Sequence, residues 1–207
     1  FGSDRLQMGI VVPQRREVVP FDGGKRLRGE DVRFIGGPLA GLPQELGGMT
    51  VNRFCGSSMQ SIHMAAGAIQ MGAGEVFVCG GIESMTRIPM GGYNFLPHPG
   101  LAKEYPEAFM AMGTTAENLA RKYQISREDQ QELAVASHAK AAKARAGGLF
   151  KEEIVPIGSV TEDGCIRPET TQEVLSTLKP AFDTEGTVTA GTSSPLTDGA
   201  AVTLVTT

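Results

Sequence analysis

Cysteine is scarce in this sequence, and long apolar or basic runs are missing. Only 3 of its 207 residues are cysteines, and no two of them form a Cys-x-x-Cys pair. Their odd number and wide spacing argue against a disulfide framework or a cysteine-based zinc site, and fit a reducing compartment. No stretch reaches the ~18 apolar residues of a membrane span, and no basic run resembles a nucleic-acid or membrane patch. We therefore expect a cytoplasmic protein without a bound metal, a nucleic-acid partner or a membrane partner.

The composition that is present is that of an ordinary globular chain. Hydrophobic residues make up 41% of the sequence and charged residues 20%, with a net charge of −4. These values are typical of a soluble protein, and the length suffices for one or two domains with a core. The first residues lack the basic and apolar regions of a signal peptide.

Residues 48–81 predict a strand, a helix and a second strand. Residues 48–54 have the apolar content of a strand, and 75–81 form an apolar run typical of a strand buried on both faces. The stretch between them predicts a helix that Ser57 or Ser58 can cap. Its apolar face, at helical spacing, consists of Met59, Ile62, Ala66 and Ile69.

The rest of the chain alternates in the same way. Residues 84–106 are irregular and rich in Pro and Gly, and two helices are predicted after them, capped by Thr114 or Thr115 and by Ser126. Further predictions are a strand at 152–160, a short amphipathic segment at 171–182 and a buried strand near the C-terminus. Before these elements, only short strands at 8–12 and 17–21 and a short helix at 31–43 are indicated. This alternation predicts the α/β class.

Cys55 lies where a predicted strand ends and a helix begins. The helix N-terminus carries partial positive charge, which stabilises a thiolate. Gly56 would allow the sharp turn of a nucleophile elbow, and the N–H of Cys55 could stabilise an oxyanion. The alternative is an inert, buried cysteine, the common state of a cysteine thiol. Local context leaves both interpretations open.

None of the histidines is an obvious base for Cys55. His63 lies eight residues further along the predicted helix, which places it ~12 Å away along the helix axis. His98 lies on a predicted loop and His138 on a predicted helix surface, so we interpret all three as structural. Cys79 fits a core strand, and Cys165 fits a polar turn.

Six long stretches follow one another along the chain: "VNRFCGSSMQSIHMAAGAI", "VCGGIESMTRIPMG", "MGTTAENLARKY", "SREDQQELAVASHAKAAKA", "FKEEIVPI" and "TLKPAFDTEGTVTAGTSSPLTDGAA". In this order and spacing they resemble the N-terminal half of the thiolases (acetyl-CoA acyltransferases). The resemblance runs from about Phe34 to the C-terminus. Residues 1–33 do not match the family and form an atypical N-terminal segment.

The resemblance implies a fold and its boundaries. Residues 34–85 and 158–207 would form the thiolase N-terminal α/β domain, a mixed sheet with helices on both faces. Residues 86–157 would form an inserted, mostly helical loop domain that covers CoA. Glu83–Met85 would support the structure. Relative to the family, the chain would be incomplete at both ends.

The resemblance also implies the chemistry. Cys55 would be the nucleophile that accepts the acyl group when a 3-ketoacyl-CoA is cleaved to acetyl-CoA and a shortened acyl-CoA, as in fatty-acid β-oxidation. CoA would be a co-substrate, with no permanently bound cofactor, and Met112 would lie near the acyl group. Ala111 stands where acetoacetyl-specific biosynthetic members carry His, which favours a broader degradative enzyme. The full-length family forms homo-oligomers.

One expectation and two alternatives qualify this function. The family's activating His, part of its oxyanion hole and its second catalytic Cys belong to the C-terminal half, so we expect the chain alone to be inactive in turnover. The alternatives are a condensing enzyme of the ketoacyl synthase type, acting on acyl-carrier thioesters, and a non-catalytic acyl-CoA-binding fragment.

Overall fold

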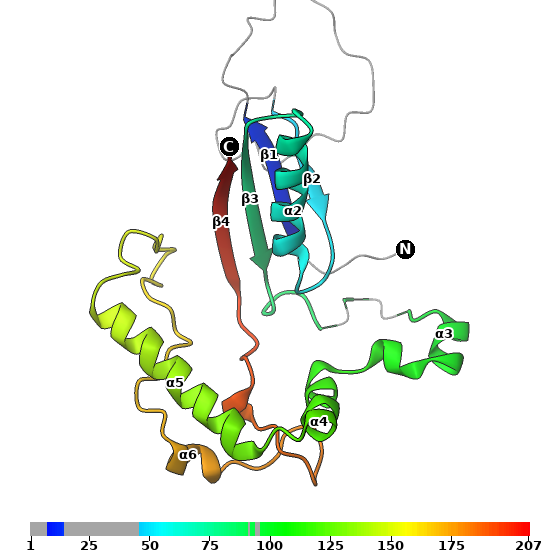
Figure 1. Cartoon of the computed structure of the whole chain (residues 1–207), viewed down its shortest axis with the longest axis vertical. Coiled ribbons are helices and arrows are strands. Elements are labelled where there is room, and N and C mark those ends of the chain that lie inside the picture. The colour runs from blue at the N-terminus through cyan, green and yellow to red at the C-terminus, as the bar shows by residue number, and fades with distance from the viewer. Residues whose placement is uncertain (1–7, 15–45, 91, 94–95) are drawn as a thin grey trace, which may run out of the picture. The chain divides into compact units, whose positions relative to one another are not determined.

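The computed structural model describes residues 8–14, 46–90, 92–93 and 96–207. The chain divides into two compact units. The sheet unit comprises Phe1–Phe95 and Leu196–Thr207, and the helical unit comprises Leu96–Pro195. The helices and strands of each unit are labelled in Figure 1.

A four-stranded sheet in the order β2-β1-β3-β4 forms the first unit. Its strands are β1 (Met8–Gln14), β2 (Met49–Val51), β3 (Val76–Glu83) and β4 (Gly199–Thr206). Each neighbouring pair is antiparallel, and β3 and β4 pair along their whole length, with Val78 opposite Leu204. The strands predicted at 8–12, 48–54, 75–81 and near the C-terminus are present, but the C-terminal strand was predicted to be buried and is mostly exposed. The elements predicted at 17–21 and 31–43 lie outside the described residues.

The α/β class is confirmed, but the described strands do not form a mixed sheet with helices on both faces. Strand β1 lies antiparallel between β2 and β3, so β2 and β3 run parallel to each other without being neighbours. Helix α2 (Ser57–Gln70) crosses from one to the other and packs on one face of the sheet. It is the one helix that the described part of the sheet unit contains. Among the described residues, an early strand thus occupies the position between the two parallel ones.

Helix α2 packs against the sheet through small side chains. Its buried residues are Ser57, Ser61 and Ala65, and Ala65 forms the core with Phe77 and Cys79 of β3. Of the predicted apolar face, Ile69 packs against this core, whereas Met59 and Ile62 are 52% and 39% exposed. Small side chains instead let the helix approach β3 closely: the Cys79 thiol donates to the Ser61 carbonyl at 3.6 Å. The predicted core position of Cys79 is confirmed, and burial raises the pKa of its thiol.

The helical unit is built around α4 (Met112–Tyr123) and α5 (Arg127–Ala146). Ser126 caps α5 in a capping box with Asp129, as predicted. Helix α4 begins after Ala111 instead of Thr114 or Thr115, and the Thr115 hydroxyl donates back to the Ala111 carbonyl. The shorter elements are α3 (Pro99–Glu104), α6 (Gln172–Ser176) and the 3-10 turns η1 (Pro106–Phe109) and η2 (Ala190–Thr192).

The strand predicted at 152–160 is a turn. Ile157 and Val160 exchange backbone hydrogen bonds of 3.0 Å across Gly158, whose φ is +59°. Pro156 precedes this turn and has no N–H to donate to a neighbouring strand. The prediction was wrong because the apolar pattern is interrupted by the two residues that favour a tight reversal.

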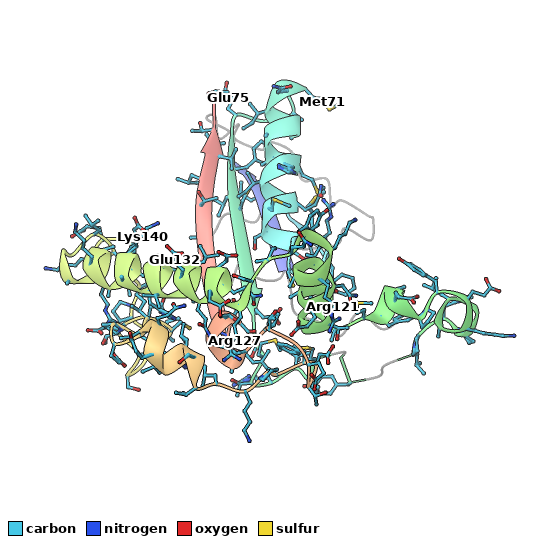
Figure 2. All side chains as sticks on the ribbon, turned by 60° about the horizontal axis from the view of Figure 1, so that its bottom comes forward. Met71, Glu75, Arg121, Arg127, Glu132 and Lys140 are labelled. Carbon is cyan, nitrogen blue, oxygen red and sulfur yellow. The ribbon has the colours of Figure 1, made fainter. Side chains whose placement is uncertain are left out.

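Two side chains attach the segment after α6 to α4 and α5. Glu117 is 1% exposed, and its carboxylate accepts from the N–H groups of Thr187 at 3.0 Å and Val188 at 2.8 Å. Arg127, labelled in Figure 2, donates to three carbonyls at the end of α6, those of Leu175, Ser176 and Leu178. The helical unit therefore continues to Pro195; the bounds of the inserted loop domain, 86–157, stay a prediction.

Candidate active site

Cys55 lies on a strained turn between β2 and α2. Gly56 is the N-cap of α2, with φ −88°. Phe54 carries the unusual conformation, with a φ of 48°. A non-glycine residue in this left-handed region costs about 1–3 kcal/mol. The sharp turn expected at Gly56 is therefore made one residue before the cysteine, at Phe54.

Hydrogen bonds within the turn hold this conformation. The Ser57 hydroxyl accepts from the Arg53 N–H at 2.8 Å and donates to the Phe54 carbonyl at 2.6 Å. The Asn52 side-chain oxygen accepts from the Phe54 N–H at 3.0 Å. Ser57 does not cap α2 in the predicted way, because its hydroxyl is engaged with residues that precede the helix.

Cys55 lines an open hollow of about 420 Å³ in the sheet unit. Three segments meet there: the start of α2, the end of β3 and the start of β4. The lining residues are Phe54, Cys55, Ser57, Ser58, Gly81, Ile82, Glu83, Thr197, Asp198, Gly199, Ala200 and Ala201. Cys55 is exposed, which contradicts the alternative of a buried cysteine; its role as a nucleophile stays a prediction.

Two carboxylates line the same hollow. Asp198 accepts from the Thr86 N–H at 2.8 Å, and this bond, with the charge of Arg87, holds the pKa of Asp198 below its usual value. The Glu83 carboxylate accepts from the Ser84 N–H at 3.2 Å. Asp198 was not among the residues predicted for the site, although it lies in one of the stretches that carried the resemblance. Its position at the hollow depends on β4 pairing with β3.

None of the three histidines belongs to the described lining of the hollow. His63 is exposed on α2 and is not a lining residue. In the helical unit, Nδ1 of His98 accepts from the Leu101 N–H at 3.2 Å, and Nδ1 of His138 accepts from the Arg167 N–H at 3.2 Å. The structural interpretation of His98 and His138 is confirmed. The described lining of the hollow therefore contains a thiol and two carboxylates, but no imidazole.

The remaining candidate residues belong to the helical unit. Met112 is the first residue of α4 and is 69% exposed; its role near an acyl group stays a prediction. Cys165 lies in the predicted polar turn, where its N–H donates to the Asp163 carboxylate at 2.7 Å. Among the described residues, no group of three or more His, Cys, Asp or Glu side chains could hold a metal ion. In the same part of the chain, every helix is too short or too polar to cross a bilayer.

The fold and site define an α/β protein with an exposed cysteine at a strand-to-helix turn. Comparison with known families identifies it further: residues 37–207 match the family described as "Thiolase, N-terminal domain". The chain belongs to the thiolase family, as its sequence motifs predicted.

Curated relatives agree with this assignment. A 3-ketoacyl-CoA thiolase of Bacillus subtilis is 48% identical over 186 residues, which cover 82% of this chain and 48% of the relative. A 3-ketoacyl-CoA thiolase of Salmonella typhimurium is 51% identical over 178 residues, 81% of this chain and 46% of the relative. This chain thus spans about half the length of the curated relatives it matches.

Solved thiolase structures have the same fold. The dimeric peroxisomal thiolase of Saccharomyces cerevisiae superposes with a TM-score of 0.68 and 37% identity, covering 75% of this chain and 42% of the yeast chain. Human mitochondrial 3-ketoacyl-CoA thiolase in complex with CoA gives a TM-score of 0.69 and 35% identity, covering 82% of this chain and 47% of the human chain.

Proposed function

We propose that this chain carries the acyl-accepting nucleophile of a 3-ketoacyl-CoA thiolase, and that Cys55 is that nucleophile. The observation that carries the proposal is the exposed thiol of Cys55 on a strained turn, facing a hollow at the start of α2. Similarity to relatives named 3-ketoacyl-CoA thiolase supports the substrate class.

The proposed reaction has two covalent steps. The Cys55 thiolate attacks the 3-keto carbon of a 3-ketoacyl-CoA, the bond between C2 and C3 breaks, and the electron pair leaves on C2. Protonation of C2 releases acetyl-CoA, while the acyl group stays on sulfur. The thiol of a second CoA then loses its proton and attacks this thioester, which releases the shortened acyl-CoA and restores the cysteine.

The electric field of the α2 dipole assists the attack by stabilising the Cys55 thiolate. The N–H groups of Gly56 and Ser57 already donate to the carbonyls of Arg53 and Phe54, each at 3.0 Å. The helix N-terminus contributes its partial positive charge near the thiolate. The proton transfers require a base and an acid, which we propose come from the part of the relatives' length that lies outside the matched stretch.

The remaining parts of the proposal follow the family. CoA is the co-substrate, as supported by the human thiolase solved with CoA, and Met112 contributes to the acyl pocket. A homo-oligomer is supported by the yeast thiolase described as dimeric. A cytoplasmic location stays a prediction, since the similar solved thiolases are described as peroxisomal and mitochondrial.

Acyl labelling tests the nucleophile directly. The purified chain is incubated with a 3-ketoacyl-CoA or a medium-chain acyl-CoA, and the modified peptide is located by mass spectrometry. We expect the acyl group on Cys55, no label in Cys55→Ser, and normal labelling in Cys165→Ser, whose thiol is half-buried in a polar turn. A label that survives Cys55→Ser would overturn the assignment.

A turnover assay tests whether the chain needs the C-terminal half of a thiolase for activity. We expect the chain alone to give no CoA-dependent cleavage of acetoacetyl-CoA, and addition of the C-terminal half of a related thiolase to restore some. Turnover by the chain alone at a rate typical of thiolases would refute the need for the second half. Labelling by acyl-carrier thioesters in preference to acyl-CoA would favour the condensing enzyme, and CoA binding without a label would favour the non-catalytic alternative.

A further inference from the structure

The direction of the Cys55 thiol depends on the backbone conformation of the residue before it. Phe54 has a φ of 48° and its side chain is 58% exposed. An L-residue rarely adopts this conformation unless its surroundings enforce it. A relaxed Phe54 would rotate the peptide that leads into Cys55 and turn the thiol away from its present position in the lining of the hollow.

One side chain holds the backbone on both sides of Phe54. The Ser57 hydroxyl accepts from the Arg53 N–H at 2.8 Å and donates to the Phe54 carbonyl at 2.6 Å. Ser57 is 2% exposed, so water does not readily replace these bonds. The two bonded groups precede and follow the φ and ψ angles of Phe54, and together they restrict both angles.

We infer that Ser57 is a positioning residue, whose hydroxyl keeps Phe54 in the left-handed conformation and thereby presents the Cys55 thiol to the hollow. That presentation matters for acyl transfer, and to this extent the inference rests on the proposed function. The effect of Ser57 on the reactivity of Cys55 toward a general thiol reagent does not depend on the proposed function.

Ser61 offers a matched control on the same helix. It is 1% exposed, and its hydroxyl donates to the Ser58 carbonyl at 2.7 Å, within α2. Ser57→Ala and Ser61→Ala therefore remove the same atom from equally buried positions one helical turn apart. Only the first removes a bond from the Phe54 turn.

The test measures the rate at which iodoacetamide alkylates Cys55 in the full chain, followed by peptide mass spectrometry across pH 6 to 9. We expect Ser57→Ala to slow alkylation about tenfold at every pH, the change in population that follows the loss of a hydrogen bond of ordinary strength. Ser61→Ala should react within about twofold of the unmodified chain, and Ser57→Thr, which keeps the hydroxyl, should recover most of the rate. Equal slowing by Ser57→Ala and Ser61→Ala, or no slowing by Ser57→Ala, would overturn the inference.

A second variant separates positioning from misfolding. Glycine adopts a positive φ without a steric penalty, so in a Phe54→Gly background the Ser57→Ala change should lose most of its effect on alkylation. An undiminished tenfold effect in that background would show that Ser57 acts in another way. Acyl-CoA labelling is scored separately: an alkylation difference together with no acyl label in the unmodified chain would preserve the role of Ser57 and refute the proposed function.

Discussion

The N–H of Thr86 donates to the carboxylate of Asp198 at 2.8 Å, although the two residues are 112 positions apart in the sequence. Thr86 follows β3 and Asp198 precedes β4, and Asp198 lines the hollow that contains Cys55. This bond connects the ends of two paired strands at the candidate active site. Because its acceptor is a carboxylate, its contribution to stability depends on pH.

Asp198→Ala should lower the thermal stability of the sheet unit at neutral pH. Hydrogen bonding from Thr86 and, least of all, the charge of Arg87 lower the pKa of Asp198 in the folded chain. A lowered folded pKa means that the stabilisation is present above the unfolded pKa and is lost as pH falls through the folded one. The difference in melting temperature between the unmodified chain and Asp198→Ala should be largest near neutral pH and should disappear in acid.

Asp198→Asn provides the control for that pH dependence. The amide keeps an acceptor oxygen for the Thr86 N–H but does not titrate. The difference in melting temperature between Asp198→Asn and Asp198→Ala should therefore stay constant across the same pH range. If the unmodified chain and Asp198→Ala differ in melting temperature by the same amount in acid as at neutral pH, the role given to the carboxylate is contradicted.

Glu117→Ala should destabilise the helical unit by about 2–3 kcal/mol, because it leaves the half-buried N–H of Thr187 and the buried N–H of Val188 without their side-chain acceptor. Glu117→Gln, which keeps one carbonyl oxygen, should cost less. Urea denaturation followed by circular dichroism measures both. Glu132→Ala, at an exposed position of α5 labelled in Figure 2, is the control and should change the free energy of unfolding by less than about 0.5 kcal/mol.

Gly67→Ala should stabilise the chain by about 0.5–1 kcal/mol. Gly67 lies inside α2, and a Cβ there would meet nothing within 4 Å, so alanine adds helix propensity without a clash. Gly113→Ala in α4 should do the reverse, because its Cβ would overlap the Phe182 ring. Thermal unfolding of the two variants checks the opposite signs; two variants of equal stability would contradict the packing described at Gly113.

The face of β4 that carries Val202 and Leu204 should promote self-association. These side chains are 70% and 64% exposed and lie on one face of an edge strand that contains no charged residue. Leu204→Lys should raise the concentration for half-association about tenfold or more. Light scattering after size-exclusion chromatography measures this effect.

Leu133→Lys is the matched control for that surface. Leu133 is 72% exposed on α5, in the other unit, so its replacement should leave self-association unchanged. A chain that remains monomeric at high concentration without any substitution would refute the prediction.

Local signals in the sequence were reliable where the interaction itself is local. The capping box joins Ser126 and Asp129, three positions apart, and it marks the start of α5 correctly. The apolar run of β3 and the start of α2 next to Cys55 were also predicted. The buried face of α2 was not, because Ser61 and Ala65 are buried by their fit against Phe77 and Cys79, which lie on a strand beyond the end of the helix.

The sequence by itself determined the family, most of the main helices and strands, and the cysteine at the start of α2, because motifs and caps depend on residues only a few positions apart. The tertiary structure decided the rest. Pairing of β3 with β4 brings Asp198 to the hollow that contains Cys55, and the left-handed conformation of Phe54 turns Cys55 into that lining. Such features arise from contacts between distant segments and from backbone strain that surrounding hydrogen bonds offset, and neither leaves a periodic signal in the sequence.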